Sequence, residues 1–235
     1  IDGVDYLWLR TPAYRGNGAG RVFNIAAFCL RLAARAKQLA RDFRPDVVIA
    51  SSTYPMDIWP ARRIARLADA KLVHEIHDLW PLSPIELGGM SPRHPFIRVC
   101  QAAEDTACRD ADVVVSMLPR VHEHLRERGL DLRKLHIVPN GVFAAEWSEA
   151  GAPLDAALAA HIDAAHAQGR IVVVYAGAHG IANALDSLLD AAALLRSERF
   201  AFVLVGDGAA RARRAVRVAS EGLTNVRLFE PIAKA

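Results

Sequence analysis

Three short segments place polar or glycine residues directly after runs that predict β-strands. The carboxyl ends of parallel strands are where open α/β sheets bind their ligands, so these segments are the first candidates for chemistry. They are His77 and Asp78 after residues 71–76, Gly177, Ala178, His179 and Gly180 after residues 171–176, and Gly206, Asp207 and Gly208 after residues 200–205.

His77 and Asp78 have the residue types of a substrate-positioning or acid–base pair. A histidine can donate to phosphate or sugar oxygens, and it titrates near neutral pH. Asp78 can orient the imidazole or accept a hydrogen bond from a substrate hydroxyl. The alternative for His77 is a packed histidine satisfied by the backbone, and both interpretations stay open. We take His77 and Asp78 as the candidate catalytic residues.

The two glycine segments have the composition of phosphate-binding turns. Glycine lets a phosphate approach backbone N–H groups closely, and a helix that begins there adds a favourable partial charge. The spacing from Gly177 to Gly180 differs from the dinucleotide-binding fingerprint, and no lysine follows as in a P-loop. An ordinary strand-to-helix turn is the alternative, because such turns also favour glycine.

We expect neither a metal site nor a bound cofactor. Asp110 and Asp112 have the spacing of an Asp-x-Asp metal motif, but they precede a predicted strand and therefore lie at the wrong edge of the sheet. His122 and His124 are two residues apart on a predicted helix, so they face different sides. No Gly-x-Ser-x-Gly segment occurs, which argues against an α/β-hydrolase.

The three cysteines have neither metal-binding nor redox spacing. Cys100 and Cys108 are separated by roughly 12 Å along one predicted helix, which is too far for a disulfide. Together with Cys29 they indicate buried thiols in a reducing cytoplasm.

The composition is that of a globular chain long enough for two modest domains. Of the 235 residues, 52% are hydrophobic and 23% are charged, with a net charge of +3. These values exclude a disordered or fibrous protein, and no apolar run has the length of a membrane span.

Arginines cluster on two predicted helices. A solvated helix face is the favoured interpretation, and contact with anionic lipid or diphosphate headgroups is the alternative. Nucleic acid is not an expected partner, because no aromatic residues interleave the clusters and no recognised nucleic-acid motif occurs. The clusters are Arg62, Arg63 and Arg66, and Arg211, Arg213, Arg214 and Arg217.

Short β-branched runs alternate with helix-length amphipathic segments, which predicts parallel sheets with right-handed crossovers. We expect strands at residues 4–9, 46–50, 71–76, 112–116, 135–138, 171–176, 200–205 and 225–229, and helices at 21–42, 59–68, 96–108, 119–128, 154–167, 184–196 and 209–221. The predicted fold is α/β, with two Rossmann-like domains at residues 1–142 and 170–235. Residues 143–169 hold no strand pattern and form the expected connection.

Eight motifs in one order resemble family-four retaining glycosyltransferases of the GT-B fold. Residues 73–84 resemble the histidine strand of that family, and their Asp-Leu-Trp-Pro-Leu-Ser-Pro segment is particularly similar to the branch of L-fucosamine (N-acetyl-fucosaminyl) transferases. The other motifs are residues 44–52, 112–116, 138–142, 175–180, 185–189, 203–208 and 225–227. The likeness covers nearly the whole chain.

This resemblance implies transfer of a sugar, with retention, from a nucleoside diphosphate donor to a glycan or lipid-linked acceptor in polysaccharide biosynthesis. We expect a UDP-sugar donor, no bound metal, and a cytoplasmic enzyme with peripheral contact at the inner face of the membrane. Residues 1–142 would form the acceptor-side domain and residues 170–235 the donor domain.

The resemblance also implies roles for single residues. His77 corresponds to the family histidine near donor sugar and acceptor, and the loop at Gly177 to the one that faces the diphosphate. The stretch after Phe229, with Ile232, corresponds to the region near the nucleotide base. We include Asn140 and both glycine segments among the expected substrate-binding residues.

Several family features differ in this chain. Ala178 and Asn183 stand where many members carry an arginine and a lysine that grip the diphosphate, and Phe143 replaces the usual aspartate. The family pattern places an acidic donor-binding segment beyond Ala235 and further strands before Ile1, so we expect a piece truncated at both ends and inactive alone. The alternatives are a GT-B enzyme that is not a transferase, such as a UDP-sugar 2-epimerase, and a non-catalytic nucleotide-binding fragment.

Overall fold

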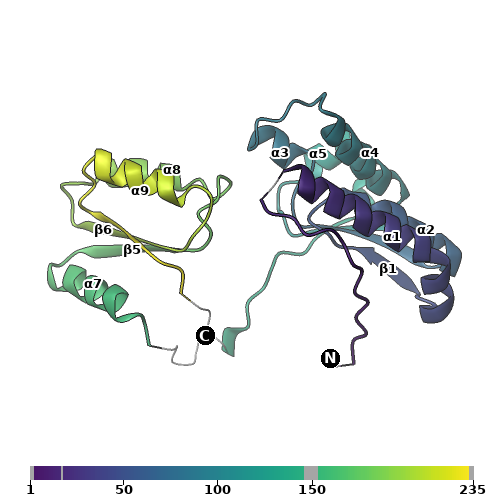
Figure 1. Ribbon diagram of the computed structural model, residues 1–235, viewed down its shortest axis with the longest axis horizontal. Helices are drawn as coiled ribbons and strands as arrows, with labels where there is room; N and C mark the ends of the chain where they lie inside the picture. The colour runs from purple at the N-terminus through teal and green to yellow at the C-terminus, as the bar shows by residue number, and fades with distance from the viewer. Residues whose placement is uncertain (1–2, 17, 146–152, 233–235) are drawn as a thin grey trace. The chain divides into compact units, whose positions relative to one another are not determined.

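The computed structural model describes residues 3–16, 18–145 and 153–232. The chain divides into two compact units, residues 1–141 (unit 1) and residues 142–235 (unit 2). Each unit holds one parallel sheet with helices packed on it (Figure 1).

The sheet of unit 1 has four parallel strands in the order β1-β2-β3-β4. They are β1 (Val47–Ala50), β2 (Lys71–Ile76), β3 (Val113–Ser116) and β4 (Leu135–Ile137). The helical elements of the unit are α1 (Ala19–Phe43), η1 (Pro55–Asp57), α2 (Ile58–Ala68), α3 (Leu82–Glu86), α4 (Pro95–Asp110), α5 (His122–Glu127) and η2 (Leu132–Lys134). A helix between each pair of parallel neighbours is the pattern of a Rossmann-like unit.

Small side chains allow the helices of unit 1 to pack closely. Ala36 and Ala40 of α1 contact Ile64 of α2, and Ala103 and Ala107 of α4 are completely buried in the main core. Burial of such apolar faces supplies the main free energy that holds helices on a sheet. This packing of the helices holds the carboxyl ends of the strands in place, where the candidate histidine lies.

Unit 2 has three parallel strands in the order β5-β6-β7, namely Ile171–Ala176, Phe200–Val205 and Val226–Phe229. Within residues 153–232 its helices are α7 (Ala156–Ala167), α8 (Leu185–Leu194) and α9 (Arg211–Ser220). Figure 1 shows α8 and α9 on one face of this sheet and α7 on the other.

The central strand β6 explains this layering. Phe202 and Leu204 pack in the cluster that includes Leu189 of α8, whereas Val203 and Val205 pack with Leu158 of α7. A strand whose alternate residues face two covered sides reads as a continuous apolar run, which is what residues 200–205 show.

The expected strand at residues 4–9 does not form, and that prediction is wrong. Residues 4–10 carry no regular secondary structure, and the sheet of unit 1 consists of β1 to β4. A run of apolar and aromatic residues gives a segment the composition of a strand, but a strand also needs a neighbour for its ladder of hydrogen bonds. Elsewhere the predicted elements form, most of them with ends shifted by a few residues, and the short helix α3 was not among the predicted elements.

Candidate functional site

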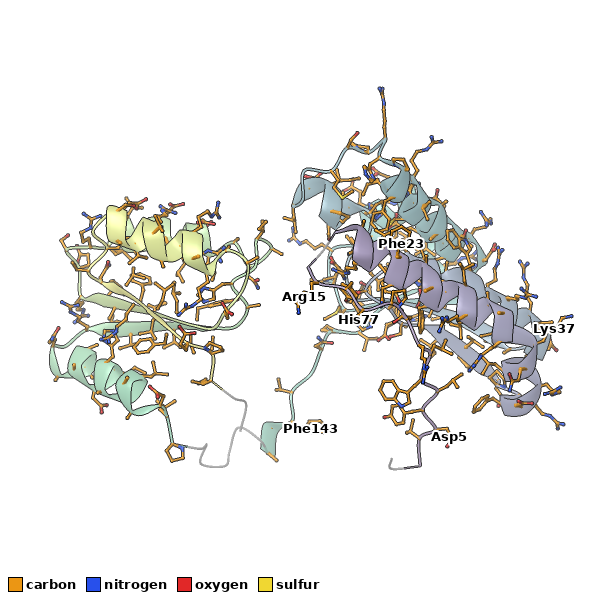
Figure 2. The ribbon with its side chains drawn as sticks, viewed as in Figure 1. Asp5, Arg15, Phe23, Lys37, His77 and Phe143 are labelled. Atoms are coloured by element: carbon orange, nitrogen blue, oxygen red, sulfur yellow. The ribbon has the colours of Figure 1, made fainter. Side chains whose placement is uncertain are left out.

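His77 lies where β2 ends, and its side chain is 35% exposed (Figure 2). Its Nε2 is 3.0 Å from Ser51 Oγ and 3.4 Å from Glu75 Oε2. Ser51 Oγ donates to Glu75 Oε2 at 2.5 Å, so the serine proton is used there and the oxygen accepts from Nε2–H of the histidine. In this tautomer the other ring nitrogen, Nδ1, can accept a hydrogen bond from a hydroxyl.

Strand register explains why these three side chains meet. Ala50, the last residue of β1, is paired with His74 of β2, so Ser51, which follows β1, lies beside Glu75, the next residue of β2. His77 follows directly after β2, two residues beyond Glu75, and alternate residues of an extended chain point to the same side. Ser51 and Glu75 are therefore the partners that orient His77, and our sequence reasoning missed both.

Asp78 accepts hydrogen bonds from two residues of the turn that follows β2. Its Oδ1 accepts from Ser83 Oγ at 2.5 Å and its Oδ2 from Trp80 Nε1 at 3.1 Å. Trp80 also packs edge-on against Phe96, with ring centroids 5.9 Å apart. Asp78 therefore braces the turn after β2, whereas Ser51 and Glu75 provide the described contacts of the imidazole.

His74 is the packed histidine of this strand. It is buried, and its Nδ1 has no hydrogen-bond partner among the described residues. Burial, and then the charge of His77, lower the pKa of His74 to about 4. The ring is therefore neutral at physiological pH, and the exposed His77 is the histidine of this edge that can meet a ligand.

In unit 2 the two glycine segments are bound to each other through their backbones. His179 N donates to Asp207 O at 2.8 Å, and Ala210 N donates to His179 O at 3.0 Å. A Cβ on Gly206 would lie 2.0 Å from Gly177 O, and the φ of Gly206 is +139°. Glycine is thus required by this close approach of two segments, independently of any ligand.

Two of the backbone amides expected to hold a phosphate already have partners. Gly180 N donates to Asn183 Oδ1 at 3.1 Å, and Gly208 N donates to Asp207 Oδ1 at 2.8 Å. A phosphate would have to displace these side-chain oxygens before it could use the same amides.

An open cavity of about 590 Å³ lies at the carboxyl ends of β5 and β6, in the size range of small-molecule sites. We call it the unit 2 groove. It is lined by Ala176, Gly177, Ala178, Val205, Gly206, Asp207, Pro231 and Ile232. The groove therefore brings together five of the expected substrate-binding residues, but its lining contains no lysine, arginine or histidine.

The remaining expected residues lie outside this lining. His179 is completely buried, and neither of its ring nitrogens has a hydrogen-bond partner in the described part of the chain. Its ring packs edge-on against Tyr175, with centroids 6.1 Å apart. Asn140 is exposed in unit 1, after β4. Phe143, at the position where the family has aspartate, is exposed as well (Figure 2).

The arginine clusters are largely engaged in ion pairs. Arg62 contacts Asp110, and Arg213 Nη2 lies 2.7 Å from Asp186 Oδ2. Arg214 departs from the predicted solvated helix face, because its side chain has no exposed surface. That prediction is therefore wrong for Arg214. The spacing of charged residues along a helix could not reveal that this arginine is buried.

The other candidates for chemistry have structural roles. Asp112 Oδ2 accepts from the Leu72 amide at 2.9 Å, and Asp110 binds arginines, so the Asp-x-Asp pair caps the sheet and helix ends. Burial raises the pKa of both Cys100 and Cys108 to about 12, which leaves these thiols protonated and unreactive. Within residues 3–16, 18–145 and 153–232, no cluster of potential metal ligands occurs and no helix is long and apolar enough to cross a membrane.

A second hollow, of about 810 Å³, lies in unit 1 and is almost entirely apolar. Phe23 of α1, Trp59 of α2 and Phe96 of α4 contribute to its walls. A neighbouring hollow shares Trp59 and adds Arg62, Arg63 and Arg66 to the lining. An apolar cavity with arginines beside it suits a ligand that has an apolar chain and an anionic group.

Unit 1 matches a known protein family. The family model of the glycosyl transferase 4-like domain covers residues 1–141, which are the residues of unit 1. WcaI of Escherichia coli strain K12, described as a glycosyl transferase of colanic acid biosynthesis, is 25% identical over 196 residues. The match covers 80% of this chain and 46% of WcaI.

Solved structures share the fold over both units. HepE of Anabaena in complex with UDP-glucose has a TM-score of 0.59 at 16% identity, over 92% of this chain and 54% of HepE. A UDP-N-acetylglucosamine 2-epimerase has a TM-score of 0.50 at 13% identity, over 89% of this chain and 51% of the epimerase. The fold is therefore α/β of the GT-B type, and the chain spans about half the length of these relatives.

Proposed function

Since the chain belongs to the glycosyl transferase 4-like family, we propose that it transfers a sugar from a nucleoside diphosphate donor, with retention, to a glycan or lipid-linked acceptor. The donor is a UDP-sugar, and no bound metal takes part. Residues 1–142 serve the acceptor, residues 170–235 serve the donor, and residues 143–169 connect them. The relatives named above are glycosyltransferases or bind UDP-sugars by their descriptions, which supports this class of reaction.

The observation that carries the proposal is the unit 2 groove. Its walls are backbone and small side chains from the ends of β5 and β6, where parallel α/β sheets bind nucleotides. The segments after both strands lead into helices α8 and α9, whose N-termini favour a negatively charged group. Ile232 and Pro231 supply an apolar wall suited to a nucleotide base.

His77 is the proposed catalytic residue of unit 1. Its ring is held by Ser51 and Glu75 and stays partly exposed, so it can donate to a sugar or phosphate oxygen or accept from a hydroxyl. Asp78 acts with it by fixing the turn that follows. A held and exposed imidazole is the arrangement that positioning and electrostatic stabilisation require.

The lipid-linked acceptor is supported by the apolar hollow of unit 1. A polyprenyl chain is apolar and a diphosphate is anionic, which matches the hollow between α1, α2 and α4 and its neighbouring arginines. The same surface supports peripheral contact with the inner face of a membrane, and with it a cytoplasmic location.

Calorimetry on the chain tests the donor site directly. UDP should bind at least about tenfold more tightly than uridine, because the diphosphate adds charge-assisted contacts, and NAD should not compete. Ala178→Glu puts a negative charge into the groove and should remove this preference. Ala164→Glu, on the exposed side of α7, is the matched control and should leave it intact. Equal affinities of the unaltered chain for uridine and UDP would contradict the proposal.

A UDP-sugar 2-epimerase is the second candidate, favoured by the structural likeness to such an enzyme over 89% of the chain. An epimerase inverts carbon 2 of the sugar without an acceptor, and the product is the epimeric UDP-sugar or, when water cleaves the bond to UDP, the free epimer and UDP; a transferase needs the acceptor. Incubation with UDP-sugars in the absence of acceptor, followed by analysis of both the UDP-sugars and the free sugar for the epimer, separates the two activities. Binding of UDP without either activity would support the non-catalytic alternative.

A further inference from the structure

We propose that Arg214, enclosed beneath the segment 177–180, is the cation that attracts the donor diphosphate to the unit 2 groove. This inference rests on the proposed function, because it assigns to that groove a charge that its own lining lacks. Arg214 acts as a positioning residue, through the segment that covers it.

The first observation is the position of the guanidinium group. Arg214 lies on α9, which follows the segment 206–208, and its side chain has no exposed surface. Its Nη2 donates to Gly180 O at 3.1 Å. The charge therefore lies against the backbone at Gly180, and Gly177 and Ala178 of the same segment line the groove.

The second observation is that this guanidinium is only partly satisfied. Its Nε and Nη1 have no hydrogen-bond partner among the described residues. A buried polar group without a partner destabilises a fold, and a charged one does so more strongly. Stability alone gives a poor reason for an arginine at this position, where an apolar side chain of similar length would pack without that penalty.

The third observation is the distribution of negative charge around Arg214. Its acidic contact is Asp186, at 3.5 Å, but Asp186 lies closer to Arg213, at 2.7 Å, and is also within 3.8 Å of Arg217. One carboxylate is thus shared among three arginines. Asp207 of the groove is exposed, so water screens its charge, whereas the enclosed charge of Arg214 is screened far less.

The neighbouring histidine cannot supply the missing charge. His179 is buried in the same segment, and its pKa is lowered by burial and then by the charges of Arg214 and Arg211. Its imidazole is therefore neutral at pH 7 and carries no charge toward a ligand. The residues 176–184 contain neither lysine nor arginine, and among the described residues Arg214 is the cation whose hydrogen bond to this segment, at Gly180 O, is observed.

The experiment compares the affinities of UDP and uridine in variants of the full 235-residue chain. Arg214→Met removes the charge and keeps an unbranched side chain. We expect UDP affinity to fall roughly 30-fold, equivalent to about 2 kcal/mol, with uridine affinity unchanged. Arg214→Lys retains a cation and should restore the preference for UDP to within about threefold. Arg213→Met is the matched control, because Arg213 is 67% exposed and binds the same Asp186.

Folding is measured in parallel by urea denaturation. Arg214→Met should be at least as stable as the unaltered chain, because exchange of a buried ion for an apolar group is often neutral or stabilising. Equal losses of UDP and uridine affinity would show a structural role and overturn the inference, as would a loss for Arg213→Met as large as that for Arg214→Met. If Arg214→Met does not fold, the UDP affinities of Arg214→Lys and Arg214→Gln are compared instead, because these two variants also differ in the presence of the charge. A wild-type chain that does not prefer UDP over uridine would instead refute the proposed donor site.

Discussion

Asp57 at the start of α2 should make the stability of unit 1 depend on pH. Its side chain is buried, and its Oδ1 has no hydrogen-bond partner among the described residues. Burial raises the pKa of Asp57 from 3.8 to about 6, although hydrogen bonds from Ser52 and from the backbone act in the opposite direction. Asp57→Asn is the perturbation, because it removes the ionisation and preserves the size of the side chain.

The sign follows from proton binding. Between pH 3.8 and pH 6 the folded state holds a proton on Asp57 that the unfolded state has released, so stability falls as the pH rises. The loss is complete above the folded pKa. Two pKa units correspond to about 3 kcal/mol, of which about 2 kcal/mol should develop between pH 4.5 and pH 7.5.

Urea denaturation at pH 4.5 and at pH 7.5 measures this effect. Tryptophan fluorescence reports the unfolding of unit 1, because Trp59 and Trp80 pack against the core that contains Ile58. The difference in unfolding free energy, variant minus wild type, should become more favourable by about 2 kcal/mol at the higher pH. Asp46→Asn, at an exposed position, should show no such change. A difference for Asp57→Asn that is the same at both pH values would refute the reasoning.

Two further predictions concern the two candidate sites. In a full-length parent that transfers sugar, His77→Ala should lower UDP release in a transfer assay by roughly 100-fold, as expected when a positioned polar catalytic group is lost, and the urea midpoint should not change. A loss of stability that accounts for the lower activity would assign His77 a structural role. Gly206→Ala should destabilise unit 2 by about 3 kcal/mol, because the added Cβ would lie 2.0 Å from Gly177 O. Gly222→Ala is the control: the added Cβ would meet no atom within 4 Å, and the variant should be destabilised by about 1 kcal/mol. Similar urea midpoints for the two glycine variants would contradict the required close contact.

The order and type of the elements could be predicted from the sequence because hydrophobic periodicity is a local property. Residues 171–176 and 200–205 show this clearly, since both form strands with the predicted ends. The segment 4–9 failed for the opposite reason. It is also a mostly apolar run, but strand formation depends on a neighbour that no local pattern specifies.

The partners of the candidate residues depend on register and burial, which are not local. Ser51 contacts His77 because β1 and β2 are aligned at Ala50 and His74, and the separation of 26 positions between Ser51 and His77 hides this contact in the sequence. Their one signal was that both follow predicted strands of the same sheet. Arg214 gave no comparable signal, because nothing in the sequence distinguishes this buried arginine from its exposed neighbour Arg213.

The backbone contact between residues 177–180 and 206–210 also limits how this groove can diversify. Because His179 exchanges two backbone hydrogen bonds with Asp207 and Ala210, and Gly206 leaves no room for a side chain, both segments form one preorganised unit. A ligand that binds there does not pay the conformational entropy of ordering a loop. Selection for another nucleotide or sugar must therefore act on side chains at the rim, such as Ala178 and Ile232, while the shape of the backbone below them stays constant.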